Sequence, residues 1–142
     1  MKKVLIGIKG MQINDGDDGA IEFMSEGVMR TVDGDTVLTY NDTGILSGQE
    51  KESVKTRVTV HGEKKVIIER SGGVSSRLII EKGVRNDCLY SIPQGNLTLG
   101  IYGKAIRNGL TESGGELSMS YSIDANMRQL SENTIKISVK EV

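Results

Sequence analysis

Four side chains that lie close together in the sequence could bind an anion. They belong to the stretch RSGGVSSRLIIEKG, residues 70–83. Arg70 and Arg77 would supply planar donors that are always charged. Ser75 and Ser76 would add short hydroxyl donors that need no deprotonation. Because such a set suits a carboxylate or a phosphate head group, we expect any binding site to be anion-selective and to surround a bend at the two adjacent glycines.

Two other functions of this stretch fit the sequence less well. A phosphate-cradling loop leads from a strand into a helix, whereas residues 78–80, Leu-Ile-Ile, continue as a strand. A serine nucleophile needs a base, and His61, the single histidine, is expected to lie exposed at a turn beside Gly62. We therefore assign no catalytic residue here. A purely structural role remains open, with the serines bonding to local backbone and the arginines in water or paired with Glu69 and Glu81.

A carboxylate and a tyrosine extend the candidate site. Glu26 lies beside Gly27 and could face the inside of a barrel, opposite Arg70 or Arg77. Burying such a pair is costly unless something polar needs it. Tyr90 could help to hold a polar or anionic head group. The candidate ligand-binding residues are therefore Glu26, Arg70, Ser75, Ser76, Arg77 and Tyr90.

The acidic segment at residues 14–19, Asn-Asp-Gly-Asp-Asp-Gly, resembles a calcium-binding loop, with Glu26 at the twelfth position counted from its first aspartate. The match fails because Gly19 stands at a ligand position and Ala20 where the loop needs glycine. One histidine and one cysteine cannot supply a zinc site. We therefore expect an acidic hairpin connection, and neither a metal nor a cofactor.

Charge and composition narrow the choice of partner and location. Lysine and arginine number 18 against 19 acidic residues, so no positive field would hold a nucleic acid or an anionic membrane.

The run Val4–Ile8 is too short for a signal peptide, and no window approaches the length of a membrane helix. Cys88, the only cysteine, can form no internal disulfide, and we expect it, like Met24 and Met119, to be an ordinary buried residue. We expect a cytoplasmic protein with a single domain over residues 1–142.

The dominant pattern along the chain has a period of two residues, which predicts strands with one dry and one polar face. Over residues 117–125, apolar side chains alternate with serines and an aspartate, and residues 54–61 and 134–140 repeat the pattern. No stretch shows convincing helical periodicity. Further strands are predicted over residues 2–13, 20–32, 36–41, 65–71, 76–82, 85–92, 96–103 and 104–111.

Short turns between these runs indicate that consecutive strands pair antiparallel. The turn signals are Asp33-Gly34, His61-Gly62, Pro93-Gln94-Gly95 and Ser113-Gly114-Gly115. The sequence therefore predicts an all-β fold, an antiparallel up-and-down (meander) barrel of eight to ten strands. Glycines inside the strands, such as Gly27 and Gly103, would allow the coiling that a small barrel requires.

Five segments carry a resemblance to a known family that spans essentially the whole chain. They are KKVLIGIKGMQ, the Ser25-Glu26-Gly27 step, RSGGVSSRLIIEKG, YSIPQGNLTLGIY and SENTIKISVKE. In these the chain resembles the YwiB-like family of bacterial proteins of unknown function. The resemblance implies a lipocalin-like or calycin-like β-barrel. It implies no activity, because fold alone does not determine chemistry.

Three classes of function remain open. In the first, a cavity inside the barrel binds one small amphipathic or anionic ligand, with a polar grip from Arg70, Ser76, Arg77 and a tyrosine. In the second, a hydrolase or isomerase uses Glu26 as base and an arginine as anion stabiliser. In the third, a packed barrel acts through a protein partner, of which a second copy in a homodimer is one case.

Overall fold

A computed structural model describes residues 2–14, 17–42, 54–72, 75–92, 95–125 and 128–142 of the chain. These residues form ten β-strands and no helix. Consequently, no helix long and apolar enough to cross a membrane occurs in the described ranges. The strands are β1 (Lys2–Asn14), β2 (Asp17–Val32), β3 (Asp35–Asp42), β4 (Val54–His61), β5 (Lys65–Ser71), β6 (Ser75–Glu81), β7 (Arg85–Ile92), β8 (Gly95–Asn108), β9 (Gly114–Ala125) and β10 (Arg128–Glu141).

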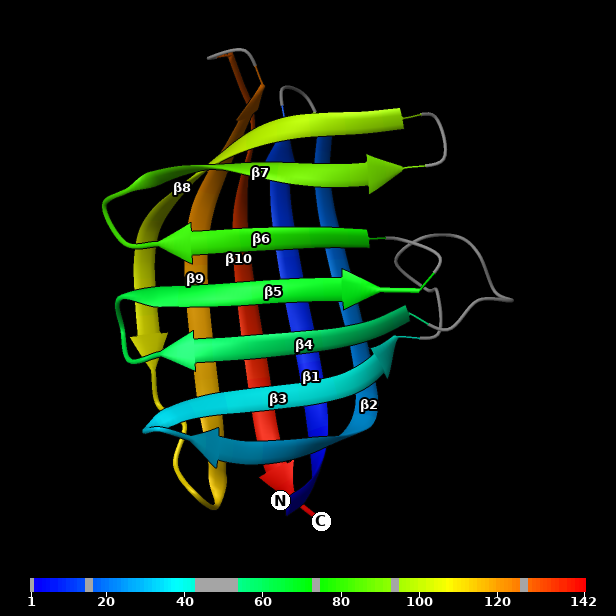
Figure 1. The fold of residues 1–142 in the computed structure, drawn as a ribbon, viewed down its shortest axis with the longest axis vertical. Helices are drawn as coiled ribbons and strands as arrows, with labels where there is room; N and C mark the ends of the chain where they lie inside the picture. The colour runs from blue at the N-terminus through cyan, green and yellow to red at the C-terminus, as the bar shows by residue number, and fades with distance from the viewer. Residues whose placement is uncertain (1, 15–16, 43–53, 73–74, 93–94, 126–127) are drawn as a thin grey trace.

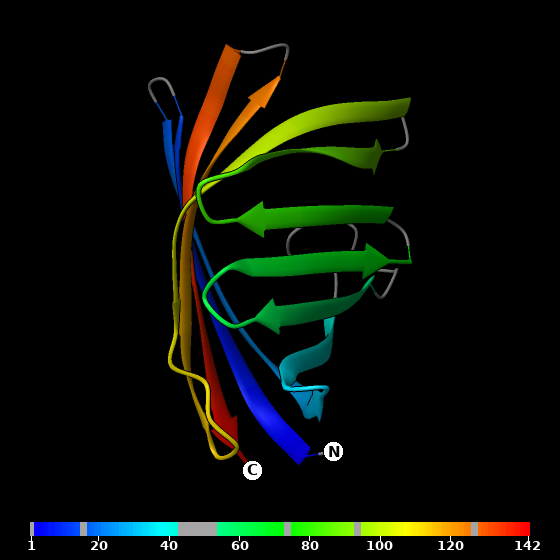
Figure 2. The ribbon, with the colours of Figure 1, turned by 60° about the vertical axis from the view of Figure 1, so that its left-hand side comes forward.

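The strands close into an antiparallel barrel in meander order, as the sequence predicts. Each strand pairs with its neighbours along the chain, and β1 also pairs with β10. Strands β3 to β7 run across the long strands β8, β9, β10, β1 and β2, so that the barrel has two layers (Figures 1 and 2). The weakest seam lies between β6 and β7, which share two paired positions among the described residues, Ser75 with Ser91 and Ser76 with Tyr90.

Two glycines lie where the chain turns from one layer into the other. Strand β2 pairs with β1 up to Met29 and with β3 from Gly27, and in Figure 1 it curves from the back layer into the front layer. A Cβ at Gly27 would lie 2.6 Å from both Ile6 Cδ1 and the carbonyl oxygen of Thr39, so a side chain does not fit. Gly103 has the backbone of Glu81 against it in the same way.

A β-bulge at Gly103 explains why the sequence pattern predicts two strands where the structure has one. The predicted strands 96–103 and 104–111 are one strand, β8. The pairing of β8 with β9 shifts between Gly103 and Ala105, which is a β-bulge that bends the strand without ending it. The bulge changes which residues face inward, and this change makes one strand look like two in the alternation pattern.

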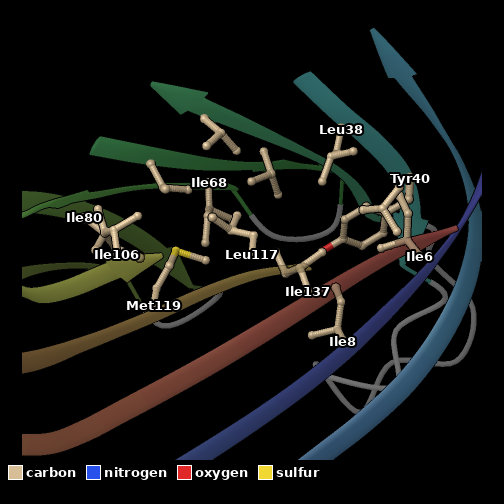
Figure 3. Close-up of a cluster of buried hydrophobic side chains, with 14 of the residues drawn as sticks. Ile6, Ile8, Leu38, Tyr40, Ile68, Ile80, Ile106, Leu117, Met119 and Ile137 are labelled. Atoms are coloured by element: carbon tan, nitrogen blue, oxygen red, sulfur yellow. The ribbon is translucent and has the colours of Figure 1, made fainter. Parts of the chain in front are cut away.

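The core fills the space between the two layers. Ile6, Leu38, Ile80, Leu117 and Ile137 are essentially fully buried, and their side chains meet from both layers (Figure 3). Along each strand, alternate residues point into this core, which is the arrangement that the period of two predicts.

The burial expected of Cys88 and Met119 is confirmed, since they are 3% and 1% exposed. The same expectation for Met24 is wrong, because this side chain is 66% exposed. Met24 pairs with Gly7, which lies between the inward-facing Ile6 and Ile8, so the position of Met24 faces outward.

Candidate anion-binding site

A row of side chains in direct register crosses the outer face of β2 to β6. Val28 pairs with Thr39, and Thr39 pairs with Arg57. Arg57 pairs with Glu69, which in turn pairs with Arg77. Side chains opposite one another on one face of a sheet are in contact range, so strand pairing gathers residues that are distant in sequence.

This row lines a hollow with a volume of about 780 Å³. Among the described residues that line it, five are basic and one is acidic. The chain as a whole carries a formal net charge of −1, so this concentration of positive charge is local. The lining residues are Val28, Arg30, Thr39, Lys55, Arg57, Glu69, Arg70, Ser71, Ser76, Arg77 and Leu89.

The acidic residue of the hollow is already paired. Arg57 Nη2 donates a hydrogen bond to Glu69 Oε1 over 3.1 Å. Glu69 therefore compensates one of the five cations. The other four basic side chains have no acidic hydrogen-bond or ion-pair partner within the part of the chain that the structure describes; they are Arg30, Lys55, Arg70 and Arg77.

A second polar row lies on the inner face of the same strands. Thr56 on β4 pairs with Arg70 on β5, which pairs with Ser76 on β6. Thr56 and Ser76 are buried, at 0% and 7% exposure. Thr56 Oγ1 and Arg70 Nε are both buried and make no hydrogen bond. Arg70 and Ser76 thus belong to this inner row and also line the hollow.

The predicted cluster of arginines around the bend is therefore divided between two faces. Because Arg70 pairs with Ser76 and Glu69 with Arg77, Arg70 points inward while Arg77 points outward. Both nevertheless line the hollow. Ser75 contributes its backbone to β6, and its side chain lies outside the described part of the structure.

Tyr90 extends the inner row by its position. It pairs with Ser76 and so continues the series Thr56, Arg70, Ser76 on β7. Nothing further is described of the Tyr90 side chain. On the opposite side, Tyr40 pairs with Thr56, is 5% exposed, and points its ring into the core (Figure 3).

The inward placement expected of Glu26 is wrong. Gly27 takes the inward position where β2 bends, so Glu26 is exposed on the outer face, paired with Leu5. It lines a second hollow of about 570 Å³ together with Lys3 and Lys55. Glu26 is thus not opposite Arg70 inside the barrel, and the hydrolase or isomerase hypothesis stays a prediction.

The single histidine and the acidic hairpin also have structural positions. His61 ends β4, and its Nδ1 lies 2.8 Å from Asp35 Oδ2. The segment that resembles a calcium loop joins β1 to β2; its residues 15–16 lie outside the described residues, and Glu26 belongs to a strand. The described residues contain no group of three or more His, Cys, Asp or Glu that could hold a metal ion.

Sequence reasoning missed four residues of the hollow and the inner row: Arg30, Lys55, Thr56 and Arg57. For Thr56 a signal exists, because it is the one polar residue among the inward valines of 54–60. For the three cations no signal exists in any single strand, since exposed lysine and arginine are ordinary on an outer face. They gather only through the register of β2 to β5.

The fold and the hollow together define a class of protein, a ten-stranded meander barrel with a basic hollow lined by residues of β2 to β7. Residues 6–137 match the family described as "Domain of unknown function (DUF1934)", and the chain belongs to this family. Its structure is similar to the crystal structure of the ywiB protein from Bacillus subtilis, with a TM-score of 0.85 and 25% sequence identity over 99% of this chain and 92% of that chain. The resemblance to the YwiB-like family is thereby confirmed. No curated protein matches the chain.

Proposed function

We propose that this protein binds a small ligand with more than one negative charge in the basic hollow. The observation that supports this proposal is the charge of the lining, five basic residues against one acidic residue that is already paired. Neighbouring cations repel one another, and an anion between them would relieve that repulsion. Arginine is also well suited to the task, because its fork of donors matches carboxylate and phosphate oxygens.

The rest of the lining and the core of the barrel indicate what kind of ligand fits and where it lies. The lining exposes apolar surface as well as charge, from residues that include Val28 and Leu89, so the ligand can carry apolar groups beside its charges. The barrel interior, by contrast, contains the large aliphatic core (Figure 3). We therefore place the ligand in the outer hollow and not in a cavity that fills the barrel. The proposal keeps the lipocalin-like or calycin-like description, supported by the closed meander, and a cytoplasmic location, supported by the lack of a second cysteine.

The test compares an arginine that lines the hollow with an arginine that does not. Arg77→Gln removes a charge from the hollow, and Arg107→Gln removes the same charge from an exposed position on β8 that does not line it. The probes are tripolyphosphate and citrate, with affinity measured by calorimetry and by thermal shift. At about 100 times its dissociation constant, a bound ligand stabilises the native protein by roughly 2.7 kcal/mol.

We expect Arg77→Gln to weaken binding of both probes about tenfold, since a hydrogen bond to a charged group contributes roughly 1.5–3 kcal/mol. Arg107→Gln should bind as the parent does. Equal weakening by the two variants would show that the probes respond to net charge and not to the hollow, and the proposal would be wrong.

A further inference from the structure

The inner row contains two polar groups whose hydrogen-bonding capacity is unused. Thr56 is 0% exposed, and its Oγ1 makes no hydrogen bond. Arg70 Nε is likewise buried without a partner, on the residue directly opposite Thr56. Buried polar groups are nearly always hydrogen-bonded, and each exception requires an explanation.

The arrangement is costliest at Arg70, because a guanidinium carries a charge as well as its donors. Arg70 is half-buried and its buried Nε lacks an acceptor, whereas a desolvated cation normally has a partner of opposite sign. Arg70 has no acidic partner in the described ranges, and its cross-strand neighbours are the hydroxyl residues Thr56 and Ser76. Three donors on three adjacent strands therefore face inward without an anion.

We propose that Thr56, Arg70 and Ser76 bind one phosphoryl group of the anionic ligand. This inference rests on the proposed function, because Arg70 and Ser76 also line the basic hollow. Arg70 and Ser76 are the part of the inner row that the hollow reaches, and Thr56 lies directly opposite Arg70 on β4.

A phosphoryl group fits the inner row better than a carboxylate does. The row presents at least three donors, one from each side chain. A terminal phosphoryl group has three free oxygens, at three corners of a tetrahedron around phosphorus, so each donor can have its own acceptor. A carboxylate has two oxygens in one plane, and one of the three donors would have to share or remain unused.

The test uses substitutions that change a donor without changing shape. Thr56→Val removes the hydroxyl and keeps the branched side chain, whereas Thr56→Ser keeps the hydroxyl. Arg70→Lys keeps the charge and removes the Nε donor and the planar fork. Each variant is titrated with tripolyphosphate and with citrate by calorimetry, and its stability without ligand is measured by urea denaturation.

We expect Thr56→Val and Arg70→Lys each to weaken tripolyphosphate binding about tenfold, and Thr56→Ser to bind close to the parent. Citrate binding should change less than threefold in all three variants. Without ligand, Thr56→Val should be at least as stable as the parent, because it removes an unsatisfied buried hydroxyl. A loss of phosphate binding in a fully stable variant separates binding from folding.

The outcomes distinguish this inference from the proposal on which it rests. If Arg77→Gln weakens binding while Thr56→Val and Arg70→Lys bind tripolyphosphate as the parent does, the hollow binds anions but the inner row does not. If citrate depends on Thr56 and Arg70 as strongly as tripolyphosphate does, the assignment to a phosphoryl group is wrong. If the parent binds neither probe, both proposals fail.

Discussion

Arg85 and Asp124 form a two-point ion pair across the outer face of β8, directly above Gly100. Arg85 Nε donates to Asp124 Oδ2 over 2.9 Å, and Nη2 donates to Oδ1 over 2.6 Å. A third hydrogen bond, from Arg85 Nη1 to Asp87 Oδ1, measures 2.9 Å. Gly100 pairs with both aspartates and leaves the space in which the guanidinium lies. One arginine therefore links β7 and β9 over the strand between them.

Gly100→Ala should destabilise the protein by about 1–3 kcal/mol, the usual cost of overpacking. The new methyl carbon would lie 2.5 Å from both Arg85 Cζ and Asp124 Oδ1, so the ion pair would have to move. Gly10→Ala is the matched control, because a Cβ at Gly10 meets nothing within 4 Å. Urea denaturation should show a loss for the first variant only. Equal midpoints would mean that the pair moves without cost.

The ion pair also predicts a pH dependence. The hydrogen bonds from Arg85 hold the pKa of Asp124 below its ordinary value. The unfolded state therefore binds a proton at Asp124 more readily than the folded state does. The ion pair's contribution to the free energy of unfolding is present above the unfolded pKa of about 3.9, and it is lost as the pH falls through the folded pKa. Denaturation midpoints measured from pH 6 downward should fall less steeply in Asp124→Asn than in the parent. Glu112→Gln, which removes an exposed carboxyl, should lose stability with falling pH as steeply as the parent does. If the midpoints of Asp124→Asn fall as steeply as those of the parent, the prediction is wrong.

Two methionines provide a direct test of the core. Met119→Ala should cost about 2–5 kcal/mol, because it leaves a cavity among closely packed side chains. Met24→Ala should change stability by less than about 0.5 kcal/mol, since surface substitutions rarely do more. The difference follows from exposures of 1% and 66%. A similar loss in both variants, measured by urea denaturation, would place Met24 in the core after all.

Cys88 should react slowly with a bulky thiol reagent in the native protein. Its side chain is 3% exposed, and burial raises the pKa of the thiol, so little reactive thiolate forms. The backbone N–H of Ile79 also donates to Cys88 Sγ over 3.4 Å. Labelling in urea should be complete and fast, which provides the control. Fast labelling without denaturant would show that β7 opens readily.

The fold could be predicted from the sequence because its signals are local. Alternation defines most strands to within a few residues, and glycine turns of a few residues require antiparallel neighbours. The bulge at Gly103 was missed because a strand that bends and a strand that ends interrupt alternation in the same way.

The candidate site was predicted only in part, because it depends on which face each residue takes. In β2, both faces carry apolar residues, with Phe23 and Met29 inward and Met24 and Val28 outward, so alternation could not place Glu26. Between β5 and β6, the register decides that Arg70 and Arg77 point to opposite sides. Composition can identify such residues as candidates, but only pairing across strands shows which of them meet.

The pairing of β1 with β10 has a consequence for how the chain folds. Residues Val4 to Asn14 align with Glu141 to Ser131, so the seam that closes the barrel joins the two ends of the chain. Contacts this far apart in sequence form late, because the entropy of closing a long loop must be lost first. On the ribosome, β1 can pair with β2 but must wait for the last strand to be synthesised. Until then β1 and β9 each present an open strand edge, which is where a nascent chain of this protein is most exposed to aggregation.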